Sequence, residues 1–318
     1  MPTFRIADIM SRFMDIYRNL EQAGDTRCVL CIGNFDGLHR GHRKLLGVAR
    51  SIADSSGTPL GVMTFEPHPR RLFRPDDPPF RITPPQVERR LLESLGVEAL
   101  FSLRFDWDFA SQSAEAFIAN VLDGGIRPSH VVVGYDFRFG QLRTGTADTL
   151  REAGYPVTVV EELADREHQA FSSSRVRVAL RHGDLDTANR LLGWDWEVEG
   201  EVVTGNRRGH TLGFPTANVE LGETLHPAYG VYAAWARVQG EETWRPAATN
   251  IGIRPMFELP VGQVEAHILD FDRDIYGEPL RVRPVRRIRG EARYASVEEL
   301  IRQMRVDCRI TREMLGVG

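Results

Sequence analysis

The sequence predicts two domains of different fold class: a doubly wound parallel α/β domain, then a small antiparallel β-barrel closed by a helix. At 318 residues, the chain is long enough for two domains. Up to about residue 183, short apolar runs alternate with helical patterns, as a parallel sheet requires. Beyond that point, short strand patterns follow one another between glycine and proline turns, which is typical of a barrel. We therefore predict domains at residues 1–186 and 187–318.

Composition and charge exclude several classes of protein. Apolar residues make up 42% of the chain and charged residues 26%, which is ordinary for a globular protein. A net charge of −4 provides no basic field for nucleic acid or an anionic membrane. No apolar run approaches the ~20 residues of a membrane span, and the charged start lacks the apolar core of a signal peptide. We expect a cytoplasmic protein without nucleic-acid or membrane partners; an oligomer is compatible with the sequence but is not predicted.

The three cysteines, Cys28, Cys31 and Cys308, are too few for a disulfide framework and fit a reducing compartment. Cys28 and Cys31 form a C-x-x-C pattern on a predicted strand, where positions three apart face opposite ways. We therefore interpret them as small buried apolar side chains rather than a metal or redox pair.

The stretch CVLCIGNFDGLHRGHRKLL, residues 28–46, carries the first candidate site. Residues 29–32 read as a buried parallel strand, and the spacing of Leu45, Val48 or Ala49, and Ile52 predicts a helix from residue 41. A glycine-rich loop between a strand and a helix start is suited to gripping phosphate with backbone N–H groups. The loop residues concerned are Gly33, Asn34, Asp36, Gly37, His39, Gly41 and His42.

His39 and His42 lie three apart at the start of that helix, so both can point into one crevice. They could bind a metal, although no third histidine or cysteine lies nearby and catalytic zinc needs at least three ligands. They could be ordinary surface histidines. They could also donate hydrogen bonds to a phosphate that gains charge in a transition state.

Further polar clusters follow strand ends, where ligands bind in open α/β sheets. Residues 61–65 form a predicted strand that leads to His68 and Pro69, and residues 130–133 form one that leads to Asp136. His68 and Asp136 could equally be turn residues. The segment SSSRVR, residues 172–177, could cap a helix or could clamp an anion through Ser172, Ser173, Ser174, Arg175 and Arg177.

The remaining elements of the first domain are predicted from local signals. The first ~24 residues read as a lead-in with one weak helix. Residues 75–85 read as a proline-rich surface loop, after which Thr83, Pro84 and Gln86 mark a capped helix start. A strand at residues 99–105, a helix from Ser113 to Gly124 and a strand at residues 155–160 follow.

After a short helix at residues 185–192, the barrel strands are predicted at residues 198–203, 231–238, 244–251, 264–271 and 280–288. A last amphipathic helix is capped at Ser296, with Leu300, Met304 and Ile310 facing inward. The stretch GNRRGHTLGFPTAN, residues 205–218, suits a flap over phosphates. In it, Thr216 and Asn218 are oxygen ligands suited to a shared Mg²⁺, or simply turn residues.

The motifs GNFDGLHRGH, TFEPHP, GYDFRFG, SSSRVR, GNRRGHTLGFPTAN, NIGIRPMF and VEAHILDFDRDIYG occur in the order found in the bacterial bifunctional riboflavin kinase/FAD synthetase family, which the chain closely resembles. The H-x-G-H string also resembles that of nucleotidyltransferases with a Rossmann-like fold. The chain departs from the family pattern at several places: Leu38, Gln141, Leu142, Ser174, Val176, His210 and Met256.

The resemblance implies two activities: phosphorylation of riboflavin to FMN by ATP in the barrel, and adenylylation of FMN to FAD by a second ATP in the α/β domain. It implies Glu265 as the general base of the kinase, although a strand glutamate paired with an arginine would look the same. It implies riboflavin, FMN, FAD and ATP as ligands, Mg²⁺ as cofactor, and His39 and His42 as catalytic groups.

The resemblance assigns flavin binding to His68, Pro69 and Asp136, and the metal to Thr216 and Asn218. It assigns ATP binding to Gly33, Asn34, Phe35, Asp36, Gly37, His39, His42, Ser172, Ser173, Ser174, Arg175, Arg177, Gly205, Arg208, Gly209, Gly213, Thr216 and Asn218. Two alternatives stay open: an FAD synthetase whose barrel only binds flavin, to which His210 and Met256 would point, and a flavin-binding regulator without activity.

Overall fold

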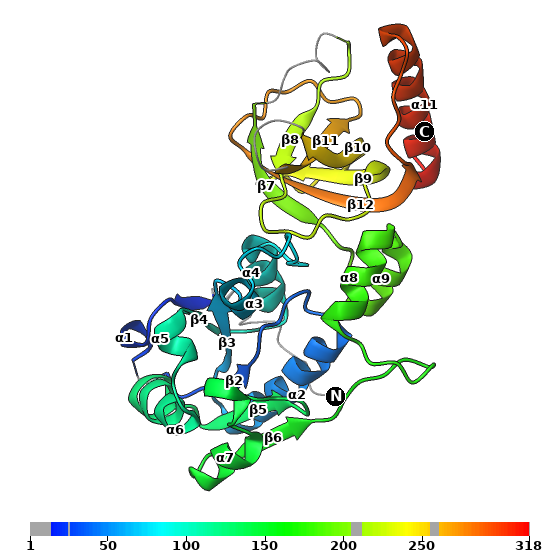
Figure 1. Ribbon diagram of the computed structural model, residues 1–318. Coiled ribbons are helices and arrows are strands. Elements are labelled where there is room, and N and C mark those ends of the chain that lie inside the picture. Colours follow the sequence, from blue (N-terminus) through cyan, green and yellow to red (C-terminus); the bar gives the residue numbers. More distant parts are fainter. Residues whose placement is uncertain (1–13, 25, 205–211, 255–260, 318) are drawn as a thin grey trace, which may run out of the picture. The chain divides into compact units, whose positions relative to one another are not determined.

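The computed structural model describes residues 14–24, 26–204, 212–254 and 261–317 (Figure 1). The chain divides into two compact units. The first comprises Met1–Phe35, Arg40–Asp77 and Arg89–Ala170, and the second comprises Asp36–His39, Pro78–Glu88 and Phe171–Gly318. Two short segments of the N-terminal half therefore belong to the compact unit that contains the C-terminal half.

The first unit is built on a six-stranded sheet in the order β1-β4-β3-β2-β5-β6, in which every pairing is parallel. The strands are β1 (Asp15–Tyr17), β2 (Val29–Ile32), β3 (Leu60–Glu66), β4 (Ala99–Arg104), β5 (His130–Gly134) and β6 (Val157–Val160). The chain moves outward from β2 through β3 to β4, and then returns to the other side of β2 to form β5. The order of the strands thus reverses between β2 and β5, which is where such sheets bind ligands.

Helices connect these strands, and the sequence accounts for where they begin. They are α1 (Leu20–Ala23), α2 (Arg40–Ser56), α3 (Pro69–Phe73), α4 (Pro85–Ser94), α5 (Trp107–Ala110), α6 (Ala114–Phe117), the π-helix η1 (Ile118–Ile126), the 3₁₀ turn η2 (Gln141–Arg143) and α7 (Ala147–Glu152). Ser113 caps α6 by accepting from the N–H of Ala116, and Thr146 caps α7.

Helix α2 packs on β2 and β5 through a buried stripe that includes Leu45 and Ala49. Ala53, rather than the half-buried Ile52, completes this stripe. The strands β2 and β5 are apolar on both faces, as expected for strands in the interior of a parallel sheet.

The second unit contains a closed antiparallel barrel in the order β10-β11-β8-β7-β12-β9. Its strands are β7 (Val198–Val203), β8 (Ala217–Glu220), β9 (Gly230–Val238), β10 (Arg245–Arg254), β11 (Val261–Ile268) and β12 (Pro279–Arg289). Helices α8 (Ser173–His182) and α9 (Leu185–Leu192) precede it, and α11 (Val297–Leu315) packs along β9 and β10 (Figure 1). Ser296 caps α11 as predicted, by accepting from the N–H of Glu299. The predicted parallel sheet and antiparallel barrel are both confirmed.

The core of the second unit extends beyond the barrel. It joins the fully buried Trp196 and Tyr232 to Val176 and Leu180 of α8 and to Ile82, which lies far upstream in the sequence. The indole N–H of Trp196 donates to the carbonyl of Ile82 at 2.7 Å. The predicted boundary between residues 186 and 187 lies within α9, inside this core, and it stays a prediction.

One expectation about the fold is wrong, and two strands were not expected. Residues 75–85 are not simply a surface loop, because Phe80, Ile82 and Thr83 are almost completely buried. The weak helix expected in the lead-in is present as α1, but the lead-in also contains a short strand, β1, which pairs with β4. The end of the predicted flap forms β8, where Asn218 pairs with Glu265 of β11. In each case, long-range pairing determines the conformation and local sequence does not reveal it.

Cys28 and Cys31 are free and buried, which agrees with their interpretation as apolar side chains. Burial raises the pKa of the Cys28 thiol to about 12. Within the described ranges, no group of three or more histidine, cysteine, aspartate or glutamate side chains could hold a metal ion. Nor does any helix in the part of the chain that the structure describes have the length and apolar character to cross a membrane.

We predict that Ile82→Ala destabilises the protein by about 2–5 kcal/mol, because it leaves a cavity in a closed core. The side chain of Ile82 is fully buried. Urea unfolding measured by tryptophan fluorescence would report the loss. Ile253→Ala is the matched control, because Ile253 is 38% exposed and should change stability by less than about 0.5 kcal/mol. Equal effects of the two substitutions would contradict the inclusion of residue 82 in this core.

Candidate active sites

The loop between β2 and α2 has an unusual backbone. Phe35 and Leu38 have positive φ angles of 46° and 41°, and both side chains are buried. Gly37, with φ of 86°, needs to be glycine, since a Cβ atom there would lie 2.9 Å from Cδ1 of Ile82. Positive φ at a residue other than glycine costs on the order of 1–3 kcal/mol and persists only where the surroundings enforce it.

The carboxylate of Asp36 provides much of that enforcement. It is 2% exposed. Its Oδ1 accepts from the backbone N–H of Ile82 at 2.8 Å, the N–H of Thr83 at 3.2 Å and the Thr83 hydroxyl at 3.3 Å. Its Oδ2 accepts from Nη2 of Arg177 at 2.6 Å. A buried charge is tolerated when it is paired and hydrogen-bonded in this way.

The backbone of the same loop is held from other directions. The hydroxyl of Ser173 donates to the carbonyl of Asp36 at 2.8 Å. The N–H of Gly37 donates to the Thr83 hydroxyl at 3.1 Å, and the carbonyl of Gly37 accepts from the indole N–H of Trp194 at 3.0 Å. Trp194, in the connection between α9 and β7, was not among the residues predicted from the sequence.

His39 follows this loop and is 7% exposed. Burial, the largest cause, lowers its pKa to about 4, while the carboxylate of Asp36 raises the pKa and the guanidinium of Arg177 lowers it. The imidazole is therefore neutral at physiological pH. A neutral imidazole can still donate one hydrogen bond.

His42 lies in the first turn of α2 and is half-buried. Its ring is 5.3 Å from the ring of Phe35, measured between centroids, at a tilt of 58°. The strained Phe35 thus packs against this imidazole. Asn34 is exposed at the end of β2, and the backbone N–H of Gly33 donates to the carbonyl of Met63 in β3.

The predicted flavin residues lie after β3 and β5, the two neighbours of β2. His68 caps α3: its Nδ1 accepts from the N–H of Arg70 at 3.1 Å, which assigns the proton of a neutral ring to Nε2. Pro69 is the first residue of that helix. Asp136 is exposed after β5, with its carboxylate folded close to Gly134. Because the sheet is parallel, these residues lie at one edge of it.

An aromatic cluster at the same edge was missed by the sequence interpretation. Phe65 is near the end of β3, and Phe105 directly follows β4. Phe105 contacts Phe65 and Phe73 edge-on at 5.2 and 5.9 Å, and Phe73 contacts Trp107 at 5.7 Å. Phe73 and Trp107 remain 56% and 63% exposed. The signal that could have found them is the placement of aromatic residues at the C-terminal ends of two predicted strands.

The serine-rich segment combines capping with the contacts described above. Ser172 caps α8 by accepting from the N–H of Arg175, and Ser174 is exposed. Arg177 has turned inward toward Asp36, and its Nε donates to the carbonyl of Phe80 at 2.9 Å. Of the residues in the predicted clamp, Ser172 caps the helix, whereas Arg177 forms hydrogen bonds with Asp36 and with the carbonyl of Phe80.

In the barrel, alternate residues of β11 line two different cavities. Ala266 and Ile268 line a cavity of about 450 Å³, while Glu265 and His267 line a second one of about 410 Å³. This follows from the period of two along a strand, which places successive side chains on opposite faces of the sheet. Thr216, directly before β8, lines both cavities.

The cavity that contains Glu265 is covered by α11 and has the size of a ligand site. The apolar part of its lining consists of Leu212, Phe214, Val231, Ala248, Leu300 and Met304. The polar part consists of Asn250, Glu265, His267, Arg289, Glu291, Tyr294 and Asp307. The predicted inward residues Leu300 and Met304 of α11 thus face this cavity. Asn250 and Asn218 flank Glu265 on the neighbouring strands β10 and β8.

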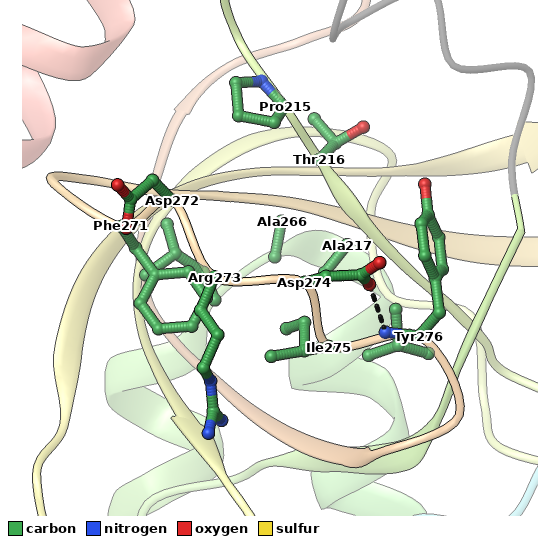
Figure 2. A pocket seen from close by; sticks show the side chains of 12 residues that line it. Pro215, Thr216, Ala217, Ala266, Phe271, Asp272, Arg273, Asp274, Ile275 and Tyr276 are labelled. Atoms are coloured by element: carbon green, nitrogen blue, oxygen red, sulfur yellow. Dashed lines mark hydrogen bonds between the residues drawn. The ribbon is translucent and has the colours of Figure 1, made fainter.

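The other cavity is bordered by the loop after β11 (Figure 2). Phe271, Asp272, Arg273, Asp274, Ile275 and Tyr276 come from that loop. Figure 2 shows the hydroxyls of Thr216 and Tyr276 on the same side of the opening, and the loop is fixed in part by a bond from the N–H of Tyr276 to Asp274 at 3.0 Å.

Thr216 and Asn218 can take part in binding Mg²⁺. The carbonyl oxygen of the Asn218 side chain accepts from Gln263 at 3.1 Å, and it has a second lone pair for a metal. Two neutral oxygens suit Mg²⁺, which usually keeps waters and takes its remaining ligands from substrate phosphates. Gly213 is described beside them, whereas Gly205, Arg208, Gly209, His210 and Met256 lie outside the described residues.

The neutral state of His39 predicts a specific loss of stability in acid. Its folded pKa of about 4 is below the value of 6.5 expected for the unfolded chain. As pH falls from 6.5 to 4, the unfolded state gains a proton that the folded state does not, so the free energy of unfolding falls by up to about 3 kcal/mol. His39→Gln should remove this component from urea unfolding curves measured at pH 7 and pH 4.5. His182→Gln, at an exposed histidine, should retain it.

Comparison with known proteins matches each half of the chain to a family. A family model described as FAD synthetase matches residues 21–175, and one described as riboflavin kinase matches residues 192–315. The bifunctional riboflavin kinase/FMN adenylyltransferase of Escherichia coli strain K12 is 40% identical over 303 residues, which are 94% of this chain and 96% of that protein. The protein of the same name from Bacillus subtilis strain 168 is 38% identical over 293 residues, 88% of this chain and 90% of that protein.

Similarity extends to a solved structure of nearly the same length. A crystal structure described as that of a macrolide-efflux protein from Streptococcus pneumoniae has a TM-score of 0.82 and 33% identity, covering 94% of this chain and 99% of that one. Together with the two matching family models, these relatives establish the family: the chain belongs to the bifunctional riboflavin kinase/FMN adenylyltransferase family.

Proposed function

We propose that the chain makes FMN from riboflavin and ATP in its barrel, and FAD from FMN and a second ATP at the edge of its parallel sheet. The observation that carries the first assignment is the position of Thr216, which lines both barrel cavities while Glu265 faces only one of them. Two substrates in these cavities would meet beside Thr216. The loop from Phe35 to His39, at the point where the strand order reverses, carries the second assignment.

In the kinase step, riboflavin occupies the cavity beneath α11 and ATP the cavity beside Tyr276. The 5′-hydroxyl of riboflavin attacks the γ-phosphorus of ATP, its proton passes to the carboxylate of Glu265, and ADP leaves. Glu265 suits this role because it lines the cavity that we assign to riboflavin, flanked by the two asparagines Asn218 and Asn250. The apolar side chains of that cavity match the faces of a flavin ring.

Thr216 and Asn218 are the residues that hold Mg²⁺ in this proposal. When bound, the ion neutralises phosphate oxygens of ATP. Thr216 orients the phosphates at the junction of the two cavities, and Gln263 fixes the side chain of Asn218 through its hydrogen bond. Gly213 and, outside the described residues, Gly205, Arg208 and Gly209 complete the ATP site of the barrel.

In the adenylyl transfer step, an oxygen of the FMN phosphate attacks the α-phosphorus of ATP, and pyrophosphate leaves. No general base is required, because the FMN phosphate is already an anion. His39 and His42 donate hydrogen bonds to the α-phosphate, and the N-terminus of α2 adds its positive end. The neutral state of His39 makes it a donor that functions over a wide pH range.

The remaining residues of this site surround the phosphates and the flavin. The residues that contribute to ATP binding are Gly33, Asn34, Phe35, Asp36, Gly37, Ser172, Ser173, Ser174, Arg175 and Arg177. His68, Pro69 and Asp136 bind FMN. The exposed rings of Phe73 and Trp107 offer the flavin an apolar surface at the same edge of the sheet.

Residues 1–186 are assigned to adenylyl transfer and residues 187–318 to the kinase. A cytoplasmic location without nucleic-acid or membrane partners stays a prediction.

One assay tests the proposed function against its alternatives. The full-length protein is incubated with riboflavin, ATP and Mg²⁺, and the flavins are resolved by chromatography. Formation of FMN followed by FAD supports two activities. FAD formed only from added FMN would indicate a barrel that binds flavin without phosphorylating it. Bound but unchanged flavin would indicate a regulator.

We predict that Glu265→Gln lowers the rate of riboflavin phosphorylation by about 10²–10⁴-fold, as expected for the loss of a general base. Conversion of added FMN to FAD should stay close to the parent rate. Glu220→Gln is the matched control, because Glu220 is an exposed glutamate on the adjacent strand β8 and should leave both rates unchanged. If the Glu265 variant phosphorylates riboflavin at the parent rate, Glu265 is not the general base.

We also predict that His39→Ala and His42→Ala each lower kcat for FMN adenylylation by about 10²–10³-fold, the usual loss when one preorganised donor is removed. The effect should fall on kcat more than on KM, because charge develops in the transition state. Riboflavin phosphorylation and an exposed-site control, His182→Ala, should be unaffected. Zinc in the parent protein that is lost on mutation would support a metal site instead.

A further inference from the structure

We propose that His267 is a positioning residue for riboflavin phosphorylation: through its hydrogen bond to the carbonyl of Pro215, it holds Thr216 where the two barrel cavities meet. The proposal rests on the proposed role of Thr216 in orienting Mg²⁺ and the phosphates of ATP. It gives a task to a side chain that lies two residues after Glu265 on β11 and that the proposed reaction does not otherwise use.

The pairing of β8 with β11 holds Thr216 from one side. The last pair of this ladder joins Ala217 to Ala266, directly after Thr216. Directly before it lies Pro215 (Figure 2), which has no N–H group and cannot donate a hydrogen bond to a neighbouring strand. The backbone that leads into Thr216 therefore needs another form of support.

The imidazole of His267 provides this support. Its Nδ1 lies 2.8 Å from the carbonyl oxygen of Pro215. A carbonyl oxygen can only accept, so Nδ1 carries the proton and donates it, and Nε2 of the neutral ring is left as an acceptor. Thr216 is thus held between a strand pair on its C-terminal side and a side-chain hydrogen bond on its N-terminal side.

A second contact fixes the orientation of the same ring. Phe214 meets the imidazole of His267 edge-on, with 5.3 Å between the ring centroids and 68° between the planes. His267 therefore contacts both of the residues that precede Thr216. A side chain whose own orientation is set by packing and by a hydrogen bond is suited to orienting another residue.

Asn218, the other proposed metal ligand, is held independently of His267. Its side-chain oxygen accepts from Gln263 at 3.1 Å, and its backbone pairs with Glu265. Loss of the bond between His267 and Pro215 should therefore displace Thr216 while Asn218 stays in place. Because a misplacement of about 1 Å is costly in an active site, this loss should appear in the rate of phosphoryl transfer.

Three substitutions of His267 separate positioning from direct contact with riboflavin. His267→Asn can place an N–H near the position of Nδ1, His267→Gln places one near Nε2, and His267→Phe keeps a ring beside Phe214 without any donor. Loss of the bond should lower kcat for riboflavin phosphorylation by roughly 10-fold in the Phe and Gln variants. His267→Asn should stay within about threefold of the parent kcat.

Other orders of activity overturn the proposal. An active Gln variant beside an impaired Asn variant would show that Nε2 acts on the substrate. Equal losses in all three variants would show that the imidazole is needed for packing alone. Parent kinetics in His267→Phe would show that the bond to Pro215 has no role in the reaction.

The dependence on Mg²⁺ is a readout that a merely structural role would not move. At saturating ATP, the Mg²⁺ concentration that gives half-maximal phosphorylation should rise roughly 3–10-fold in His267→Phe, because Thr216 is a proposed ligand of the ion. KM for riboflavin should stay within about twofold of the parent value. A raised KM for riboflavin with an unchanged dependence on Mg²⁺ would contradict positioning through Thr216.

A double variant tests whether His267 acts through Thr216. Thr216→Ala removes the hydroxyl that His267 is proposed to position. Adding His267→Phe to Thr216→Ala should then lower kcat by less than about a further twofold, because both changes affect the same group. Effects that multiply in the double variant would overturn the proposal.

Controls distinguish a folding defect and a failure of the proposed function from a failure of this inference. Each variant should still convert added FMN to FAD, and His182→Asn, at an exposed histidine, should leave both activities unchanged. If His267→Phe loses both activities, the order of the Asn and Gln variants decides. Parent kcat in Thr216→Ala would refute the proposed role of Thr216, and positioning through it, whereas an impaired Thr216→Ala beside a fully active His267→Phe refutes only the positioning role.

Discussion

A buried carboxylate, that of Asp36, organises the loop between β2 and α2. A charge removed from water must be satisfied by donors, and here they come from residues 82 and 83 and from Arg177. These donors are 46 to 141 positions away in the sequence. The requirement to satisfy one charge therefore brings three distant segments together and fixes the conformation that precedes His39. The same segments supply Ile82 to the core around Trp196, so the loop and a hydrophobic core are stabilised jointly.

In the barrel, the corresponding constraint is the alternation of side chains along β11. Because neighbouring residues face opposite sides of the sheet, one strand can line two cavities with different chemistry. Glu265 and His267 face the cavity under α11, while Ala266 and Ile268 leave room in the other. A shift of one residue in the pairing with β8 would exchange these faces and remove Glu265 from its cavity. The register of β11 against β8 thus determines which cavity Glu265 lines.

Local signals in the sequence were sufficient for much of this structure. The apolar run of β2, the caps at Ser113 and Ser296 and the change of period after residue 183 depend on neighbours within a few positions, so the two fold classes could be predicted. The burial of residues 80–83 could not, because it depends on Asp36 and Trp196, which are distant in sequence. β8 could not be predicted for a similar reason, because this strand is stabilised by pairing with β7 and β11. Candidate residues could be found by their motifs. The contact of Arg177 with Asp36 could not be predicted, because the two residues are 141 positions apart.

The contrast between Asp36 and Glu265 follows from the two reactions. A hydroxyl nucleophile carries a proton that must be removed, and in the barrel the carboxylate of Glu265 faces a cavity of ligand size. An FMN phosphate carries no such proton at neutral pH, so adenylyl transfer requires no general base. The aspartate of the N-terminal loop is accordingly buried, its charge compensated by Arg177. It holds the loop that precedes the neutral imidazole of His39. The chemistry of each nucleophile thus explains why one carboxylate is presented and the other is enclosed.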